Sequence, residues 1–286
     1  MSTRPRSITV LTRRNPAHTA DALRRVIDLA VDAGVEVRVP PEEVEKHGLE
    51  RCEGTVHGAD PSGPTDLSVV LGGDGTILSS LRLFAGRSVP TFAFNWGAIG
   101  FLATVERTQL EEGMERALSG DFDVLPLPAM NAETAEGDRL AVNDISFHRH
   151  PHGRVAELAY SVRGEQLGAV RSDGLVVSTP AGSTGYNLAN GGPVMAWGVE
   201  GYVVSFIAPH TLTARALVVA PDDVLEVVNR STEEPVEMTT DGRRVCAMAP
   251  QGRVRVRFEE GKAQLAQLPG ANFYHRLRDK FGRLSY

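Results

Sequence analysis

The residues of this chain that could do chemistry gather first in a short glycine turn, Gly72-Gly73-Asp74-Gly75-Thr76. This turn directly follows the apolar run DLSVVL and precedes a segment whose apolar residues have helical spacing. Glycines let a backbone approach a phosphate closely, and the N–H groups at a helix start attract anions. Asp74 is the one charged side chain in the turn, and a carboxylate beside phosphates is repelled unless it handles a metal ion or a hydroxyl proton. The turn therefore predicts phosphate chemistry with Asp74 as the catalytic residue.

The same turn also has a plain structural interpretation, in which GGDG is a tight bend chosen for its backbone conformation. Its place between a hydrophobic strand and a helix favours a ligand instead, because ligands of open α/β sheets bind at the carboxyl ends of the strands. The chain has no Walker A lysine motif and no GxGxxG after a strand. These absences disfavour an ordinary P-loop enzyme and a Rossmann dehydrogenase.

A second cluster of glycine and hydroxyl residues covers residues 172–193, with the sequence SDGLVVSTPAGSTGYNLANGGP. Its apolar beginning predicts a strand that enters a loop rich in Ser, Thr, Tyr and Asn. Such neutral groups can hydrogen bond to the polar edges of adenine, ribose and carboxamide without adding charge. A simple linker between two strands is the structural alternative. A serine hydrolase is disfavoured, because Ala181 stands where a GxSxG nucleophile elbow needs its first glycine.

The elements around the first turn alternate between strand and helix patterns, which predicts a parallel sheet with helices on its faces. Residues 40–65, rich in Pro, Glu, Gly and His, are expected to be a loop. The spacing of apolar residues predicts strands at 7–12, 35–39, 66–71 and 89–95. It also predicts a helix from the N-cap Thr19 to Gly34, one at 77–84, and one that starts in a capping box of Thr108 and Glu111 and ends at Gly120.

The pattern changes after residue 120, where short β-rich runs separated by Gly, Pro, Asn and Asp replace the helical periods. These runs lie at 140–147, 155–163, 174–179, 201–207, 216–219, 224–228 and 253–258, and a weak helical pattern follows at 273–281. We expect an α/β domain at residues 1–120 that carries the glycine turn, and an all-β, sandwich-like domain at 121–265. Residues 266–286 could pack back on the first domain.

Composition excludes several classes of protein. The formal net charge of −6 argues against nucleic acid as the main partner, because phosphate backbones need a basic face. Cys52 and Cys246 form no CxxC pair, which argues against a zinc cluster or a disulfide framework. The chain has no apolar run of the roughly 18 residues that a membrane span needs and no signal-peptide pattern at Met1–Arg6. The simplest interpretation is a cytoplasmic protein without a membrane partner.

Both clusters carry a family resemblance. The GGDGT string resembles the signature of the NAD kinases and, more distantly, of diacylglycerol and sphingosine lipid kinases and of phosphofructokinases. The second cluster is similar to the NAD kinase motif DGLxxSTPTGSTAY with a following GGP, and it selects that family. The resemblance covers residues 66–245. It implies an ATP- or polyphosphate-dependent NAD kinase, which phosphorylates the 2′-hydroxyl on the adenosine ribose of NAD to give NADP.

The resemblance also implies ligand contacts in the later part of the chain. Asn143-Asp144 matches an Asn-Glu pair that contacts the adenosine part of NAD, and Arg171 is a candidate for the dinucleotide phosphates. His210 stands in a PHSLS-like segment, where a structural hydrogen bond is favoured, and Arg154 aligns only loosely. The residues expected to bind substrate are Gly72, Gly73, Gly75, Thr76, Asn143, Asp144, Arg154, Arg171, Asp173, Ser178, Thr184, Gly185, Tyr186, Asn187, Leu188, Ala189, His210 and Arg243.

The implied mechanism places NAD in a cleft between the two domains, with Asp74 accepting the proton of the 2′-hydroxyl. Mg²⁺ or another divalent cation is expected to accompany ATP, and no metal site made by the chain itself is expected. The resemblance further implies a homodimer or homotetramer. Two other functions stay open at this point: a lipid kinase that shares GGDGT, and a non-catalytic dinucleotide sensor that has kept the fold.

Overall fold

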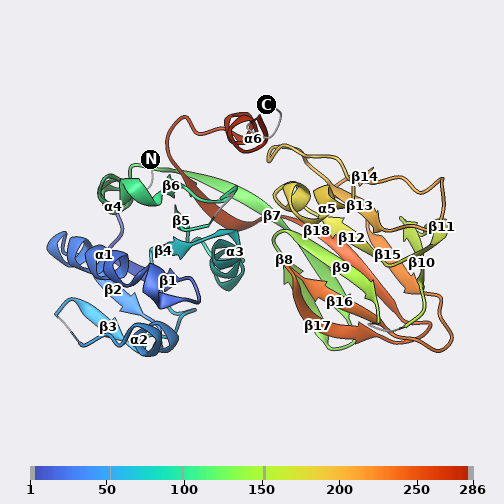
Figure 1. Ribbon diagram of the computed structural model, residues 1–286, viewed down its shortest axis with the longest axis horizontal. Helices are drawn as coiled ribbons and strands as arrows, with labels where there is room; N and C mark the ends of the chain where they lie inside the picture. Colours follow the sequence, from blue (N-terminus) through green and yellow to red (C-terminus); the bar gives the residue numbers. More distant parts are fainter. Residues whose placement is uncertain (1–3, 52, 98–99, 151–152, 283–286) are drawn as a thin grey trace. The chain divides into compact units, whose positions relative to one another are not determined.

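The computed structural model describes residues 4–51, 53–97, 100–150 and 153–282. The chain divides into two compact units, which we call the α/β unit (Met1–Pro126 with Ala263–Tyr286) and the β unit (Leu127–Lys262). Two long strands, β7 (Asp123–Thr134) and β18 (Arg253–Gln267), carry the chain from one unit to the other (Figure 1). None of the helices in the described part of the chain is long and apolar enough to cross a membrane.

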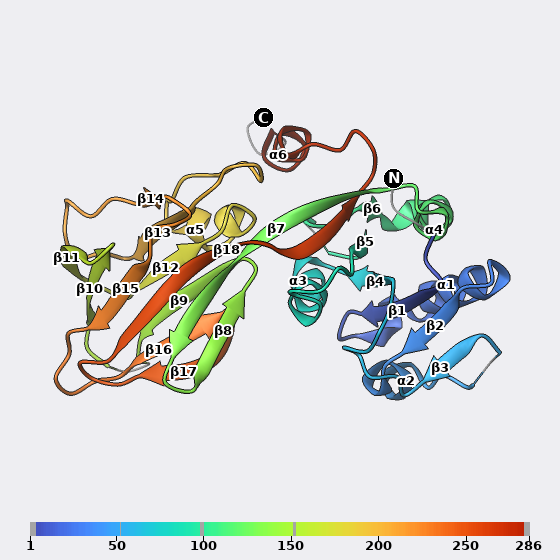
Figure 2. The same cartoon turned by 180° about the vertical axis from the view of Figure 1, so that it is seen from behind.

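The α/β unit is built on a parallel sheet. Its strands are β1 (Ser7–Thr12), β2 (Glu36–Val39), β3 (Thr55–His57), β4 (Leu67–Gly72), β5 (Thr91–Asn95) and the short β6 (Val105–Glu106). They lie in the order β6-β5-β4-β1-β2-β3, and every neighbouring pair is parallel (Figure 2). All six residues of β4 are buried, as expected for a central strand that is covered on both faces. The strands predicted at 7–12, 35–39, 66–71 and 89–95 are confirmed.

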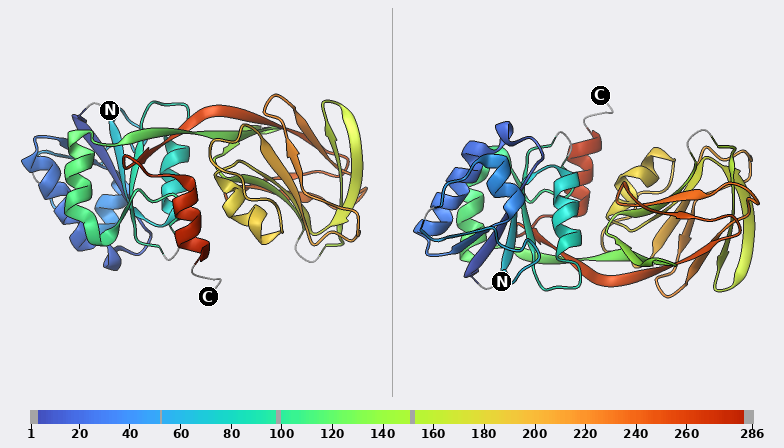
Figure 3. Two further views of the ribbon diagram at one scale, coloured as in Figure 1. Left: turned by 90° about the horizontal axis from the view of Figure 1, so that it is seen from above. Right: turned by 90° about the horizontal axis from the view of Figure 1, so that it is seen from below.

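Helices cover both faces of this sheet. They are α1 (Ala20–Asp32), α2 (Pro41–His47), α3 (Asp74–Leu83) and α4 (Leu110–Ser119). Figure 3 shows α1 and α4 on one face and α3 on the other. The predicted apolar stripe of α1 is the buried one, and α4 ends at Gly120 in the left-handed conformation, as predicted. Thr19 does stand at the N-cap of α1, but its side chain makes no capping hydrogen bond.

Two local predictions are wrong. Residues 40–65 contain α2 and β3 where a loop is expected; α2 begins at Pro41, has acidic residues in its first turn and ends at a left-handed Gly48. These signals at the two ends define the helix, although its apolar pattern is too short to predict one. The capping box of Thr108 and Glu111 does not form, because a 3₁₀ turn at Arg107–Gln109 precedes α4 and puts Gln109 at the N-cap. Cys52 lies outside the described residues.

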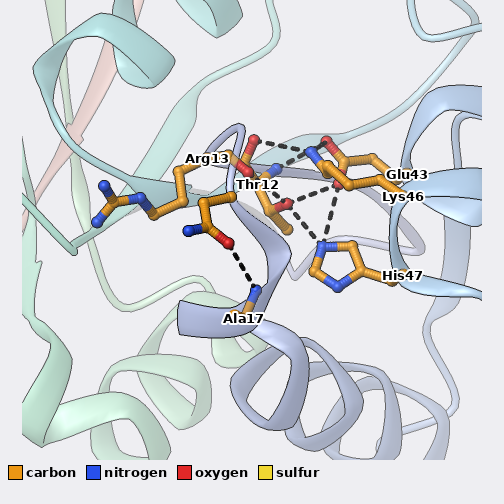
Figure 4. A network of polar contacts seen from close by, with 7 residues as sticks. Thr12, Arg13, Ala17, Glu43, Lys46 and His47 are labelled. Carbon is orange, nitrogen blue, oxygen red and sulfur yellow. Dashed lines mark hydrogen bonds and ion pairs between the residues drawn. The ribbon is translucent and has the colours of Figure 1, made fainter.

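A buried carboxylate ties α2 to the end of β1 (Figure 4). Glu43, only 5% exposed, accepts hydrogen bonds from the Thr12 backbone N–H at 2.9 Å and from the Thr12 hydroxyl at 2.7 Å. Lys46 Nζ donates to the same carboxylate at 2.8 Å, and His47 Nε2 lies 2.9 Å from the Thr12 hydroxyl. Burial lowers the pKa of His47, and the neighbouring Glu43 opposes that shift. The network fixes the chain immediately before Arg13.

Glu43→Ala is expected to lower the free energy of unfolding by about 3 kcal/mol. It leaves the Thr12 backbone N–H without its acceptor and the partly buried Lys46 ammonium with only the Thr12 carbonyl, 3.1 Å away. Glu42, exposed on the same helical turn, provides the matched control, and Glu42→Ala should change stability by less than about 0.5 kcal/mol. Urea titration of both variants measures the difference. Equal stabilities would show that the Glu43 network contributes nothing to the fold.

The β unit consists of two antiparallel sheets around one apolar core. The first sheet has six strands in the order β14-β13-β12-β9-β16-β17. In the second sheet, β10 pairs with β11 and β15, and β15 also pairs with β18. Strand β7 pairs with β8 and β18. Phe147, Leu175 and Val204 of the first sheet join Leu158 and Val256 of the second in one buried cluster. The strands are β8 (Gly137–Ala141), β9 (Asp144–Arg149), β10 (Ala156–Val162), β11 (Glu165–Ser172), β12 (Gly174–Ser178), β13 (Tyr202–Ile207), β14 (Leu217–Val219), β15 (Leu225–Asn229), β16 (Val236–Thr240) and β17 (Arg243–Met248).

The last segment of the chain belongs to the α/β unit. Leu265 of β18 pairs in parallel with Thr91 of β5, and the Thr104 hydroxyl donates to the Ala266 carbonyl at 2.9 Å. Helix α6 (Phe273–Phe281) follows, at the residues where the sequence predicts a helix, and its N-cap Asn272 accepts a hydrogen bond from the backbone N–H of His275 at 2.8 Å.

Candidate active site

The glycine turn connects β4 directly to α3. The strand ends at Gly72, Gly73 is the N-cap, and the helix begins at Asp74, three residues before the predicted start. The prediction placed that start too late because the glycines hide the helical pattern, although the backbone N–H groups of Thr76 and Ile77 already donate to the Gly73 carbonyl. Asp74 therefore stands in the first turn of a helix, where the helix dipole favours a negative charge.

The Asp74 carboxylate is held by two backbone amides from another part of the chain. Phe101 N–H donates to Oδ2 at 3.0 Å, and Leu102 N–H donates to Oδ1 at 3.1 Å. A carboxylate oxygen has two lone pairs, so each oxygen can still accept one further hydrogen bond. This arrangement orients the carboxylate without consuming its capacity to receive a hydroxyl proton.

The segment that supplies these amides was missed by sequence reasoning. Asn95 ends β5 and donates to the Glu106 carboxylate at 3.1 Å, while its own Oδ1 accepts the Gly97 N–H at 2.9 Å. Gly100 has φ +59°, and a Cβ there would lie 2.5 Å from the Asn95 amide nitrogen. A second glycine-rich stretch immediately after a buried strand, beginning at residue 95, is the signal that could have found it.

The glycines of the turn differ in what surrounds them. A Cβ on Gly72 would lie 2.5 Å from Thr76, and a Cβ on Gly73 would lie 3.3 Å from the Cα of Gly97, so both are packed closely. A Cβ on Gly75 would meet nothing within 4 Å. The turn borders a cavity of about 670 Å³ whose lining residues are Arg13, Arg14, Asn15, Pro16, Gly73, Gly75, Thr76, Trp96 and Gly97.

In the β unit, Asn143 and Asp144 stand at the start of β9 and are fixed by the turn at Asp241. One Asp241 oxygen accepts the backbone N–H of Asn143 at 2.7 Å and that of Asp144 at 3.2 Å. Asp144 is only 7% exposed, and its carboxylate accepts no hydrogen bond from any residue that the structure describes. Burial, with a smaller contribution from the Asp241 charge, raises the pKa of Asp144 to about 7.

The hydroxyl-rich loop after β12 has a buried half that holds it in place. The Ser178 hydroxyl donates to the Asn143 carbonyl at 3.2 Å, and Ser183 donates to the Pro180 carbonyl at 2.7 Å. Asn187, fully buried, donates to the carbonyls of Ser183 and Pro193 at 3.0 and 2.9 Å. Among the predicted ligand residues, Ser178 and Asn187 are thus placed to shape the loop from within.

The other half of this loop is accessible. Thr184, Tyr186 and Leu188 are partly exposed, and Gly185 and Ala189 are exposed. The Tyr186 ring stacks on His148 of β9, with ring centres 5.7 Å apart and planes inclined by 12°. No signal in the sequence points to His148, because Tyr186, on which its ring stacks, lies far along the chain from it.

The predicted cations lie elsewhere in the β unit. Arg154 and Arg171 line a cavity of about 270 Å³ together with Arg149, whose Nε lies 2.7 Å from Asp173 Oδ1. The backbone N–H of His210 donates to the Arg171 carbonyl at 2.8 Å, while the His210 side chain is exposed. Arg243 is exposed on β17, next to the Asp241 turn.

No group of three or more His, Cys, Asp or Glu side chains that could hold a metal ion occurs among the residues that the structure describes. In the α/β unit, the Asp74 carboxylate already accepts two backbone hydrogen bonds. Each Asp74 oxygen keeps a further lone pair, so this carboxylate could still face a cation that accompanies a bound phosphate.

A strand–glycine turn–helix with an amide-held carboxylate, on a chain that also carries a hydroxyl-rich loop in an all-β unit, suits a phosphotransferase. The comparisons with known proteins agree. The family model described as the ATP-NAD kinase N-terminal domain matches residues 8–122, and that of the ATP-NAD kinase C-terminal domain matches residues 142–268. The chain belongs to the NAD kinase family.

Curated relatives support this assignment, and solved structures share the fold. The chain is 37% identical to an NAD kinase of Gemmatimonas aurantiaca over 77% of this chain and 78% of that protein, and 33% identical to one of Geotalea daltonii over 80% and 82%. The fold is similar to that of yeast NADH kinase complexed with NADH, with a TM-score of 0.86 at 22% identity over 100% of this chain and 89% of the other. It also resembles an Archaeoglobus fulgidus NAD kinase in complex with ATP, with a TM-score of 0.73 at 24% identity over 97% and 98%. The predicted fold class is confirmed.

Proposed function

We propose that this chain transfers a phosphoryl group from ATP, or another phosphate donor, to the 2′-hydroxyl on the adenosine ribose of NAD, giving NADP. The observation that carries the proposal is the Asp74 carboxylate, held by two backbone amides at the glycine turn of an NAD kinase family member. Asp74 accepts a hydrogen bond from the 2′-hydroxyl and takes its proton as the transfer proceeds. A carboxylate is a weak base, which suffices because phosphoryl transfer depends chiefly on alignment and charge neutralisation.

The α/β unit supplies the groups that suit the phosphates of the donor. The N–H groups at the start of α3, the closely packed glycines and the two arginines of the 670 Å³ cavity all favour an anion. A divalent cation such as Mg²⁺, if it accompanies the donor nucleotide, would neutralise charge on the donor's phosphates.

The β unit supplies the groups that suit the dinucleotide. The Asp144 carboxylate accepts hydroxyl hydrogen bonds of a ribose, and the accessible half of the hydroxyl-rich loop, at Thr184, Gly185, Tyr186, Leu188 and Ala189, contacts the base and sugar. Arg171 is the cation that we propose for the dinucleotide phosphates, and it shares its cavity in the β unit with Arg154. Arg243, exposed near the Asp241 turn, is a further predicted ligand residue.

Gly75→Ala is expected to lower kcat/KM for ATP by about tenfold, because its Cβ enters the space that the phosphates use, while the free energy of unfolding changes by less than about 1 kcal/mol. Gly72→Ala is the matched comparison: its Cβ meets Thr76, so it should destabilise the fold by about 1 to 3 kcal/mol. Steady-state kinetics and urea titration of both variants separate the two effects. If Gly75→Ala showed wild-type kinetics, the glycine turn would not be part of the donor site.

The activity is tested with a panel of donors and acceptors. Purified protein with Mg²⁺ is given ATP or polyphosphate as donor, and NAD, NADH or diacylglycerol in micelles as acceptor. Formation of NADP, with the new phosphate located on the 2′-oxygen by ³¹P NMR, is the expected result. Phosphorylated lipid would favour the lipid kinase alternative, and bound NAD without turnover would favour a dinucleotide sensor.

We further propose, from the family resemblance, a cytoplasmic enzyme that forms a homodimer or homotetramer. Light scattering coupled to size exclusion measures the molar mass, which a monomer would show as that of one 30.8 kDa chain.

A further inference from the structure

Arg276 reaches from α6 toward the segment that holds Asp74. Its Nη1 donates to the Phe101 carbonyl at 2.8 Å and also to the Ala103 carbonyl, and its Nη2 donates to the side-chain oxygen of Gln267. Gln267 is itself only 6% exposed. The guanidinium is therefore fixed on one side by β18 and on the other by the chain at residues 101–103.

The same short segment contacts Asp74 through its other polar groups. The peptide group between Phe101 and Leu102 is the central link, because its carbonyl accepts from Arg276 and its N–H donates to Asp74 Oδ1 at 3.1 Å. A charged donor on a carbonyl polarises the peptide and strengthens the hydrogen bond that its N–H donates. One peptide group thus connects the guanidinium to the carboxylate.

The charge of Arg276 is also stabilised by the carboxylates of Asp74 and Glu106. Burial lowers the pKa of Arg276 to about 10, and the negative charges of Asp74 and Glu106 oppose that shift. Arg276 is therefore a cation at neutral pH. A lysine could not replace it fully, because an ammonium lacks the planar fork that donates to two carbonyls and an amide oxygen at once.

We propose that Arg276 is a positioning residue for phosphoryl transfer: it holds residues 101–103 so that their backbone N–H groups keep the Asp74 carboxylate aimed at the acceptor hydroxyl. The inference rests on the proposed function, in which Asp74 receives the hydroxyl proton. It assigns to the C-terminal helix a part in the reaction that the glycine turn alone does not reveal.

The first test compares Arg276→Ala with Arg278→Ala. Arg278 lies on the same helix and has a side chain that is 70% exposed. Among the residues that the structure describes, its guanidinium contacts Asp279 and His275, both on that helix. Arg276→Ala should lower kcat by about 10- to 100-fold with KM for NAD and ATP changed less than about threefold, because misplacement of a catalytic group costs rate more than binding. Arg278→Ala should keep kcat within about twofold of the wild-type value. The kcat of Arg276→Lys should lie between those of Arg276→Ala and Arg278→Ala.

Chemical rescue separates positioning from misfolding. Arg276 lines a cavity of about 1090 Å³ through which a small cation can reach the vacated position. Guanidinium chloride on the order of 10 mM, far below denaturing concentrations, should restore a measurable part of kcat in Arg276→Ala. It should have no such effect in Arg278→Ala. Absence of rescue, with a melting temperature lowered in proportion to the lost activity, would reduce Arg276 to a structural role and overturn the inference.

A double substitution tests whether the effect passes through Asp74. In an Asp74→Asn background, Arg276→Ala should change the residual kcat by less than about threefold, because residues that act as a unit are not additive. If Arg276→Ala lowered kcat by the same factor in the Asp74→Asn background as in the wild type, the inference would be overturned, while the proposed role of Asp74 would stand. Wild-type activity in Asp74→Asn alone would instead overturn the proposed function, so the two failures are distinguishable.

Discussion

Asp74→Asn is expected to lower kcat for NADP formation by about 10²- to 10⁴-fold while the Kd for NAD changes less than about threefold. The side chain keeps its size, but an amide cannot take the hydroxyl proton. It also presents an NH₂ group to one of the two backbone N–H donors that the carboxylate now satisfies. The rate is measured by NADP detection under saturating substrates, and NAD binding is measured by calorimetry.

The matched control is Asp28→Asn on the exposed face of α1, which should retain wild-type kcat. Thermal unfolding of both variants shows whether the Asp74 substitution has damaged the fold. An Asp74→Asn enzyme that keeps most of its turnover would contradict the assigned catalytic role.

Asp144→Asn should make the folded protein more stable above neutral pH. Burial raises the pKa of Asp144 to about 7, whereas an aspartate in an unfolded chain titrates near 4. Between these values the folded state binds the proton that the unfolded state has released, so this residue's contribution to stability falls as pH rises from about 4 to about 7. The substitution should therefore raise the free energy of unfolding by about 2 to 4 kcal/mol at pH 8, and by about 1 to 1.5 kcal/mol at pH 5.

The same substitution should weaken NAD binding by about tenfold at pH 8, because a neutral amide replaces a charged acceptor of ribose hydroxyls. Urea titrations at the two pH values and calorimetry with NAD measure both effects, with the exposed Asp222→Asn as a control. A variant with unchanged stability at pH 8 would refute the raised pKa. If the Asp144→Asn variant bound NAD as tightly as the wild type, Asp144 would not belong to the dinucleotide site.

Most of the α/β architecture could be predicted from residue spacing. The β4 and β5 strands are buried along their whole length, and β1 has a buried apolar centre. The apolar stripe of α1 repeats with helical period, so local pattern and burial agree. The pattern failed where short elements depend on other signals: α2 has seven residues and is defined by its caps and by the buried Glu43. Strands β11 and β17 were missed because their mostly exposed residues lack a clear alternation. Strand β16 was missed although its burial alternates, because it has only five residues and three of them are polar.

Only some of the residues of the site could be predicted from the sequence, for the same reason. The glycine turn with Asp74 is local in sequence, so its type and spacing could be interpreted directly. The groups that orient Asp74 are not local: Phe101 and Leu102 follow it by 27 and 28 positions, and Arg276 follows Phe101 by 175. No spacing rule connects such residues, and only the parallel sheet, which returns the chain beside β4, brings them together.

The most direct test is a crystal structure of the wild-type protein with NAD bound and no phosphate donor. We predict that an Asp74 carboxylate oxygen lies about 2.6 to 3.2 Å from the 2′-oxygen of the adenosine ribose, the range of a hydrogen bond to a general base. A 2′-oxygen more than about 5 Å from Asp74, beyond the reach of a hydrogen bond even through flexible side-chain adjustment, would contradict this account.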